Sequence, residues 1–537
     1  MTLNWLDRFS DWNPQIFREL KGRLKRRNLI LTITATLTAQ LLVLMYFWNL
    51  IPPPRSTDKP YLYPSHSAYC TGKGSYGYFE CLYDALGHPL LDWQHWWFDI
   101  FQALSWTLPF VLLIAGVYML ISDLGKEERR GTLNFIRLSP QTSHNILLGK
   151  VLGVPAIPYL AAALTVPLHL LAAIGAQVSI AEVFSIYLVT AAVCTFFYSS
   201  ALLYAFLGGV QGWIGAVVIW FGYSIFFQLW QTYSSFNHSS EQRYLGLGEW
   251  FHLWIGTNLG FAVAFALLTL GTGSYWIWQA VNRRFRNPNV TLLNKRQSYQ
   301  MTLCFEVWLI GFFVRDIPEY YRPFNELIVL GFCNLLWFIV LIATITPQRQ
   351  MLLDWARYRR ERVTRTQPFW RRSMMPDLLW GEKSPALVAI ALNLLIAMVV
   401  VTPWILGWGE AGDSISGLAT IALGSTFILI CAVIAQLMMF MKSPRRVAWA
   451  VGLLAIVIIL PPVVLCILQL YPDKAPLAWL FSIGAFAALQ SGLSTTAVLT
   501  AFLGHLGILS LLSLRLTQQL RRAGESELKA LMAAGRG

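Results

Sequence analysis

Long runs of apolar residues, separated by short polar segments, dominate the sequence. Each run is about 20 residues long, the length that a helix needs to cross a hydrocarbon core of about 30 Å. Twelve such runs lie at residues 28–50, 98–122, 151–174, 182–208, 211–231, 253–279, 302–318, 324–346, 386–407, 417–441, 448–470 and 495–515. The pattern predicts an all-α polytopic membrane protein with about twelve transmembrane helices.

An additional apolar stretch at residues 477–492 is shorter and rich in glycine and alanine. If it crossed the membrane, the basic tail that follows the last run would lie outside. A re-entrant element buried against protein avoids this conflict. We therefore expect twelve spans and one re-entrant segment near the C-terminus.

Residues 1–27 form a basic segment ahead of the first run. Ile16, Phe17, Leu20 and Leu24 fall on one helical face, and the basic residues lie mostly opposite. A helix of this kind lies in the membrane interface; a solvated basic anchor is the alternative. No short apolar stretch with a small-residue cleavage site follows, so the first run is a retained helix rather than a signal peptide.

The distribution of charge sets the orientation of the helices. Only 13% of the residues are charged, against 56% apolar, which excludes an ordinary soluble enzyme. The net charge of +14 could indicate a protein that binds nucleic acid. The basic residues, however, cluster between apolar runs instead of forming the single stripe that such binding needs. With the N-terminus in the cytoplasm, 34 of the 41 Lys and Arg residues fall on cytoplasmic segments. Both termini are predicted to be cytoplasmic, with the helices in the plasma (inner) membrane.

The twelve runs divide into two sets of six. We expect an interfacial helix at 1–27, a six-span unit at 28–280, a basic cytoplasmic linker at 281–301, a second six-span unit at 302–515 and a cytoplasmic tail at 516–537. The second unit is a weak repeat of the first, inferred from the architecture alone.

Motifs of catalysis are missing from the sequence. It contains no H-E-x-x-H, C-x-x-C, G-x-S-x-G or G-x-G-x-x-G pattern, and its histidines lack the spacing of metal ligands. Gly-Lys occurs three times but is followed by Gly74, Glu127 and Val151, so no P-loop is present. We expect no catalytic residue, no metal site and no cofactor.

Three ionisable residues of the predicted spans are functional candidates, because burial in hydrocarbon is costly unless the group is paired. Glu326 lies at the external end of the eighth span. Glu306 falls near a cytoplasmic boundary, where we expect water to reach its carboxylate. His169 and His505 are expected to form hydrogen bonds between helices.

Two of the seven cysteines, Cys70 and Cys81, share the first external loop. An oxidising exterior would allow them to form a disulfide. Two unrelated thiols remain the alternative.

The loop at residues 126–150 carries the clearest functional pattern. A charged run leads into Gly131-Thr132-Leu133 and a short amphipathic helix, which Ser139-Pro140 stops, and the loop ends at Gly149-Lys150. A short helix connected rigidly to two spans is suited to transmit a movement. An ordinary solvated loop is the alternative.

This loop resembles that of the permeases of type-2 ATP-binding-cassette exporters, in which a charged run precedes G-T-L and is followed by S/T-P, S and G-K. The resemblance implies that the loop forms a coupling helix, which docks into a separate ATPase subunit present in two copies. ATP binding closes the ATPase dimer, and the coupling helix at 126–148 transmits this movement. Arg129 and Asn134 depart from acidic positions of that pattern, which favours a dedicated partner. The coupling residues that the resemblance implies are Glu128, Arg130, Gly131, Thr132, Leu133, Ile136 and Pro140.

The expected function is the transmembrane permease subunit of an ATP-driven exporter of unknown substrate, with one chain supplying both halves or two chains pairing. A twelve-span ion-coupled secondary transporter is the first alternative, and Pro461-Pro462 is a helix break of the kind found there. A membrane-embedded lipid- or glycosyl-modifying enzyme is the second, with Asp316 and Glu319 as its paired carboxylates.

Overall fold

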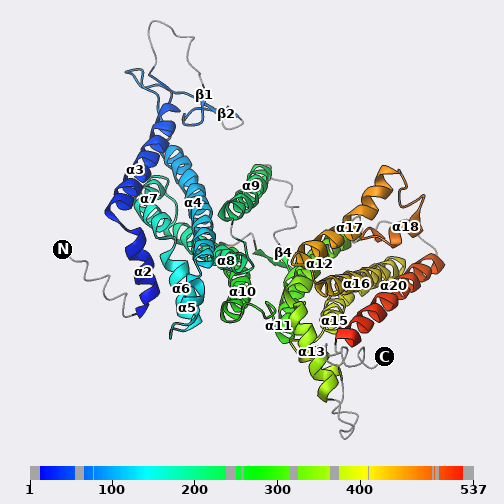
Figure 1. Ribbon diagram of the computed structural model, residues 1–537. Coiled ribbons are helices and arrows are strands. Elements are labelled where there is room, and N and C mark those ends of the chain that lie inside the picture. Colours follow the sequence, from blue (N-terminus) through cyan, green and yellow to red (C-terminus); the bar gives the residue numbers. More distant parts are fainter. Residues whose placement is uncertain are drawn as a thin grey trace, which may run out of the picture. The chain divides into compact units, whose positions relative to one another are not determined.

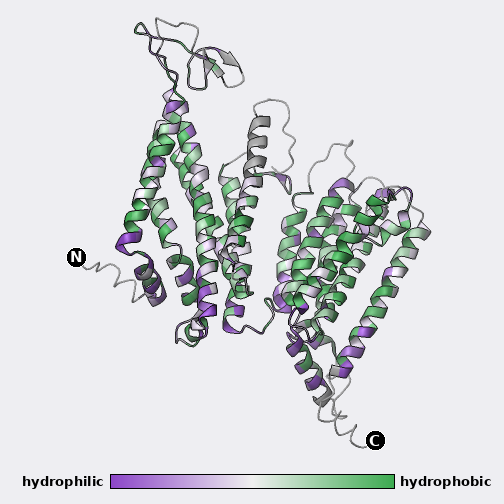
Figure 2. Cartoon of the chain, turned by 45° about the horizontal axis from the view of Figure 1, so that its top comes forward, coloured by the Kyte–Doolittle hydropathy of each residue, from purple (hydrophilic) through white to green (hydrophobic). Residues whose placement is uncertain are grey.

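The protein is almost entirely helical, with two small antiparallel sheets (Figure 1). The computed structural model describes residues 12–54, 66–75, 78–209, 211–237, 249–255, 259–314, 324–362, 374–408, 411–485, 489 and 495–523. Hydrophobic residues run along the long helices, and hydrophilic residues gather toward their ends (Figure 2).

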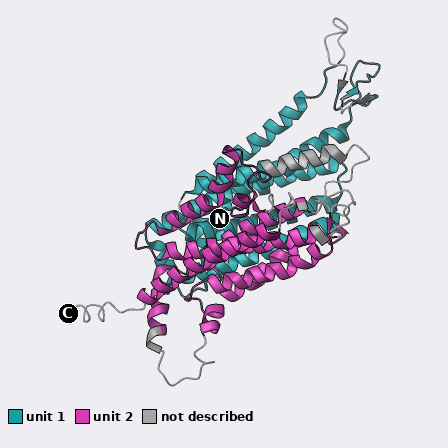
Figure 3. Cartoon of the chain, turned by 90° about the vertical axis from the view of Figure 1, so that its right-hand side faces the viewer, with its two compact units in different colours: residues 1–245, 256–286 teal, residues 246–255, 287–537 magenta. Residues whose placement is uncertain are grey.

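The chain forms two compact units (Figure 3). Unit 1 comprises Met1–Leu245 and Gly256–Arg286, and unit 2 comprises Gly246–Ile255 and Asn287–Gly537. The division at Arg286 falls inside the segment that we predicted to be a linker, 281–301.

Unit 1 is built around one long central helix, α4, which packs against α3, α7, α8 and α9, while α10 packs against α8. The helices of this unit are α2 (Pro14–Arg23), α3 (Arg26–Asn49), α4 (Trp93–Arg129), α5 (Thr132–Arg137), α6 (Ser143–Gly153), α7 (Ala156–Gly175), α8 (Ile180–Phe206), α9 (Gly212–Asn237) and α10 (Leu259–Arg286). Because Gly116 has no side chain, the Tyr198 ring lies directly against α4. Its hydroxyl donates a hydrogen bond of 2.7 Å to the Leu112 carbonyl. This contact joins α8 to α4 in the core of the unit.

Between α3 and α4, three short strands form a sheet in the order β1-β3-β2. They are β1 (His66–Ser67), β2 (Gly74–Ser75) and β3 (Tyr78–Glu80), all paired antiparallel. A disulfide joins Cys70 to Cys81 beside this sheet.

Unit 2 has α16 at its centre, in contact with α12, α15, α17 and α20. The helices of this unit are α11 (Lys295–Ile310), α12 (Phe324–Ile345), α13 (Arg349–Arg362), α14 (Met374–Trp380), α15 (Leu387–Leu406), α16 (Ala411–Met439), α17 (Arg446–Ile467), α18 (Pro476–Leu480) and α20 (Thr495–Ala523). The hairpin of β4 (Glu249–Trp250) and β5 (Leu253–Trp254) covers the end of α11, where the Phe251 amide donates to the Gly311 carbonyl at 2.8 Å.

Three helix pairings occur in both units. The pairs α3–α7, α4–α8 and α8–α10 of unit 1 have counterparts in α11–α15, α12–α16 and α16–α20 of unit 2. In both units the pairs follow the same order of spans along the chain.

Ten helices among the described residues are long and apolar enough to cross a membrane: α3, α4, α7, α8, α10, α12, α15, α16, α17 and α20. The twelve spans that we predicted include two others. The described apolar part of α9 covers only Gly212–Ser224, and the 16 residues of α11 extend about 24 Å.

Helix α11 begins and ends earlier than the predicted span 302–318, because polar residues fix its N-terminus. Asn294 and Gln297 form a capping box, in which each side chain bonds to the other residue's backbone amide. The helix therefore begins at Lys295, inside the predicted linker, and ends at Ile310. The stretch at 477–492 includes the short helix α18, and Leu480 and Ser482 are buried against the unit.

Candidate functional site

The predicted coupling segment, residues 126–150, consists of the end of α4, the six-residue helix α5 and most of α6. Gly131 joins α4 to α5 with a φ of 70°, a left-handed conformation that favours glycine. After Ser139 and Pro140, the Thr142 hydroxyl accepts a hydrogen bond from the Asn145 amide and caps α6. The chain thus turns at Gly131 and again before α6.

The apolar side chains of α5 and its C-cap residue differ in exposure. Leu133 and Ile136 are each only 6% exposed and belong to the hydrophobic core of unit 1. Phe135 and Leu138 are 79% and 85% exposed. Of the seven residues that the resemblance implied, Leu133 and Ile136 therefore support α5 from within, whereas the exposed ones are Glu128, Arg130, Gly131, Thr132 and Pro140.

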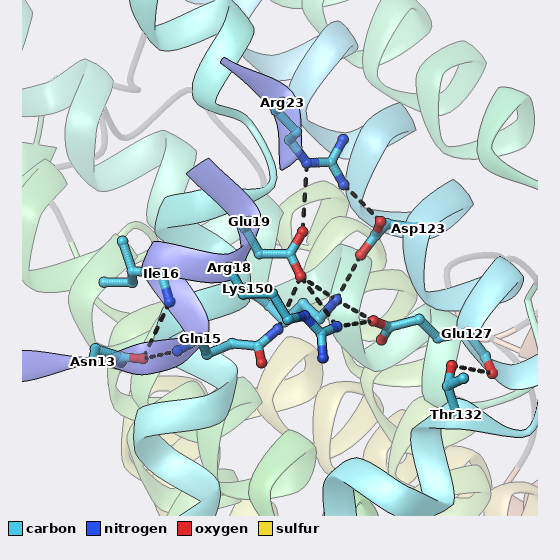
Figure 4. Close-up of polar contacts among 10 residues, drawn as sticks. All are labelled: Asn13, Gln15, Ile16, Arg18, Glu19, Arg23, Asp123, Glu127, Thr132 and Lys150. Carbon is cyan, nitrogen blue, oxygen red and sulfur yellow. Dashed lines mark hydrogen bonds and ion pairs between the residues drawn. The ribbon is translucent and has the colours of Figure 1, made fainter. Parts of the chain in front are cut away.

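The last residue of this segment, Lys150, is a buried lysine (Figure 4). The Lys150 side chain is 3% exposed, and its Nζ donates to Glu19 Oε1 at 2.7 Å, Asp123 Oδ2 at 2.7 Å and Glu127 Oε1 at 2.6 Å. These carboxylates come from α2 and α4, and Lys150 from α6. One ammonium group therefore joins three helices.

Two arginines of α2 complete this group. Arg23 Nη2 lies 2.6 Å from Asp123 Oδ1, and Arg18 Nη2 lies 2.7 Å from Glu127 Oε1. We call the six residues the Lys150 cluster; they are Arg18, Glu19, Arg23, Asp123, Glu127 and Lys150. Its three positive and three negative charges balance.

The pKa of Lys150 lies above the ordinary lysine value. Burial alone would lower this pKa, but Asp123, Glu19 and Glu127 surround the ammonium and outweigh burial. The oxygens of these carboxylates lie within 4.8 Å of one another, a spacing that suits metal ligands. Since Lys150 Nζ already bonds to all three, it supplies the positive charge of the site.

Two glycines of α6 allow α2 to approach. A Cβ at Gly149 would lie 2.7 Å from Gln15 Cβ, and a Cβ at Gly153 would lie 2.6 Å from Glu19 Cβ. The buried residues of α2 are Gln15, Ile16 and Glu19. Helix α2 thus packs a partly polar side on α6, whereas we predicted an apolar face in the membrane interface.

Sequence reasoning missed the Lys150 cluster. Gly149-Lys150 was considered only as part of the family resemblance, and Glu19 lies 131 residues away in sequence. The four-residue spacing of Gly149 and Gly153 was the available signal, because small residues at this spacing permit close helix packing.

The three candidate residues of the predicted spans, His169, Glu306 and His505, are buried. His169 forms hydrogen bonds with Ser105 and Tyr187, and His505 forms one with Thr426, as expected for contacts between helices. The prediction of a hydrated Glu306 is wrong, since Glu306 is fully buried and Asn334 Nδ2 lies 3.4 Å from its Oε2. The reason is the packing of α11 against α12 and α15. Asp316 and Glu319 lie outside the described residues.

Comparison of the chain with family models, curated proteins and solved structures finds no match.

Proposed function

We propose that this chain is the transmembrane permease subunit of an ATP-driven exporter, and that a separate ATPase subunit docks on the segment 126–150. Ten apolar helices and the resemblance of this segment to the coupling loop of type-2 exporter permeases support the proposal. In this proposal the helices span the inner membrane, and both termini lie in the cytoplasm. ATP hydrolysis takes place in the partner.

The exposure pattern of α5 carries this proposal. Phe135 on the six-residue helix α5 and Leu138 directly after it present two large apolar side chains to solvent. Exposed apolar side chains surrounded by polar groups mark interaction sites. Glu128 and Arg130 are exposed beside them and form a polar rim. The occupant that fits is an apolar groove of the ATPase subunit.

Unit 1 supports this contact from behind. Leu133 and Ile136 fix α5 to the core, and the Lys150 cluster fixes α6 and the end of α4 to α2. A displacement of α5 by the ATPase is thereby transmitted to α3, α4 and α7, which continue from these helices along the chain. The residues of the segment perform no covalent chemistry; they transmit motion.

Unit 2 supplies the second half of the transporter. Between α12 and α15, where unit 1 has its coupling segment, unit 2 has the basic helix α13 and the short helix α14. Met374, Met375 and Trp380 are exposed on α14. A second ATPase copy contacts this surface, so one chain serves a pair of ATPases.

Copurification tests the docking proposal. The tagged chain, purified from its native membrane in mild detergent, is expected to retain a soluble protein with a P-loop. Phe135→Asp/Leu138→Asp should abolish retention, because two carboxylates would have to enter an apolar groove. Leu86→Asp, at another highly exposed leucine outside the segment, is the matched control. Retention of no P-loop protein, or equal retention by both variants, refutes the proposal.

A secondary transporter is the second candidate, and the burial of Glu306 favours it. An ionisable group buried within a predicted span is a candidate ion-binding site. If Glu306→Gln abolishes substrate uptake driven by a proton gradient in vesicles without ATP, this candidate replaces the exporter.

A further inference from the structure

A second site lies where α9 begins, beside the cytoplasmic end of α4 as oriented above. A pocket of about 370 Å³ opens there between α2, α4 and α9. We call it the α4–α9 pocket; the residues that matter are Arg23, Tyr118, Lys126, Arg129, Gly212 and Trp213. Its volume suits a small polar group, at the lower end of the range of about 300–1,000 Å³ for ligand pockets.

The pocket carries uncompensated positive charge. Asp123 also lines it, but Arg23 and Lys150 bond to both oxygens of that carboxylate at 2.6 and 2.7 Å. Among the described residues, neither Lys126 nor Arg129 forms an ion pair. The Arg129 side chain is positioned by a hydrogen bond of 3.1 Å from Nε to the Gly125 carbonyl.

The first turn of α9 adds backbone donors. A Cβ at Gly212 would overlap Ser122 Oγ, so the absence of a side chain allows α9 to begin directly against α4. The first amides of a helix have no acceptor within it, and the helix dipole makes this end positive. Two cationic side chains and a helix N-terminus therefore converge on one pocket, an arrangement that binds phosphate groups.

The pocket also borders an apolar surface. Tyr118 and Trp213 line it and are exposed, and Val217 and Phe221 continue an exposed apolar face along α9. Lys126 lies eight residues beyond Tyr118, about 12 Å along α4. A headgroup layer is about 5–8 Å thick. The distance of about 12 Å between Tyr118 and Lys126 is therefore enough to reach from the acyl chains to the phosphate level. Tyrosine and tryptophan are the side chains that favour this boundary.

We propose that the α4–α9 pocket binds the headgroup of an anionic phospholipid. Its phosphate contacts Lys126, Arg129 and the first turn of α9, and its acyl chains lie along the apolar face of α9. Basic pockets between membrane helices bind such headgroups. Lys126 and Arg129 also belong to the segment 126–150, but both line the pocket, so the assignment holds whether or not an ATPase docks there.

Native mass spectrometry of the purified full chain tests the assignment. Dioleoyl phosphatidylglycerol and dioleoyl phosphatidylcholine are added separately, and the bound lipid is counted. The wild type should prefer phosphatidylglycerol. Lys126→Gln/Arg129→Gln should weaken its binding about 30-fold, because each basic residue near an anionic surface contributes about 1 kcal/mol.

The controls separate this site from general attraction. Lys442→Gln/Arg445→Gln removes the same charge at exposed positions of unit 2 and should leave binding within twofold. Equal binding by wild type and the Lys126/Arg129 variant, or an equal loss in both variants, overturns the proposal. Inorganic phosphate at about 10 mM, enough to fill most of a site with a Kd of about 1 mM, should not displace the lipid; displacement would assign the pocket to free phosphate and overturn the proposal. Matching melting temperatures of the variants establish that each is folded.

Discussion

Replacing Lys150 with methionine removes the ammonium group that joins α2, α4 and α6. The variant keeps the length of the side chain but leaves Glu19, Asp123 and Glu127 facing one another, with only Arg18 and Arg23 to balance three negative charges. Removal of one partner from a buried ion pair costs about 3–5 kcal/mol. Since Lys150 is 3% exposed and donates to three carboxylates, we expect a cost in this range.

This cost should appear as local opening of α2. Helix α2 packs on α6 and α7, so its release leaves the other helices in place. Hydrogen exchange followed by mass spectrometry should show the amides of residues 14–23 exchanging about 150- to 5,000-fold faster, which corresponds to the lost 3–5 kcal/mol. Lys442→Met, at an exposed lysine of unit 2, should leave these rates unchanged.

The pH dependence provides a second readout. The pKa of Lys150 is raised in the folded chain, so its contribution is fully present below the ordinary value of 10.5 and is lost as the pH rises through the folded pKa. Protection of residues 14–23 should therefore decline in the wild type as the pH rises above the ordinary lysine value of 10.5. Unchanged exchange of α2 in Lys150→Met at neutral pH would refute the reasoning.

Three further predictions follow from single residues. Gly131→Ala should destabilise the turn by about 1–2 kcal/mol, because φ is 70° there; a melting temperature equal to that of the wild type would contradict this. In Gly153→Leu the new side chain should overlap Glu19 and push α2 away from α6, so the amides of residues 14–23 should exchange faster. Exchange as slow as in the wild type would contradict this prediction. Burial lowers the pKa of Lys295 to about 8, partly offset by Asp377, so the unfolded chain binds more protons between pH 8 and 10.5 and stability should rise there by about 3 kcal/mol. Chemical denaturation should show this rise in the wild type and a flat profile in Lys295→Gln.

Hydropathy predicted most of the long helices because each is a continuous apolar run. It failed for α11, where a capping box places the start at Lys295 and the hairpin residue Phe251 bonds to the carbonyl that follows the helix end. These are local hydrogen bonds, and a window average over about 20 residues does not detect them.

The coupling segment shows a similar division. The spacing of Leu133 and Ile136 predicted an amphipathic helix, and Ser139-Pro140 predicted its end. The structure has a helix that ends at Arg137, just before these two residues. Which side faces the core depends on α4 and α10, whose contacts with α5 and α6 no local pattern encodes. The partners of Lys150 were hidden for the same reason, since they lie 23 to 131 residues away in sequence.

The Lys150 cluster also orders events during synthesis. Glu19 leaves the ribosome 131 residues before Lys150, an interval of about 7–25 s at 5–20 residues per second. Throughout that time the basic residues of α2 lack the lysine that joins their carboxylate partners. Completion of α6 then brings their charge into a neutral cluster. The charges of α2 are therefore neutralised only after α6 has been made.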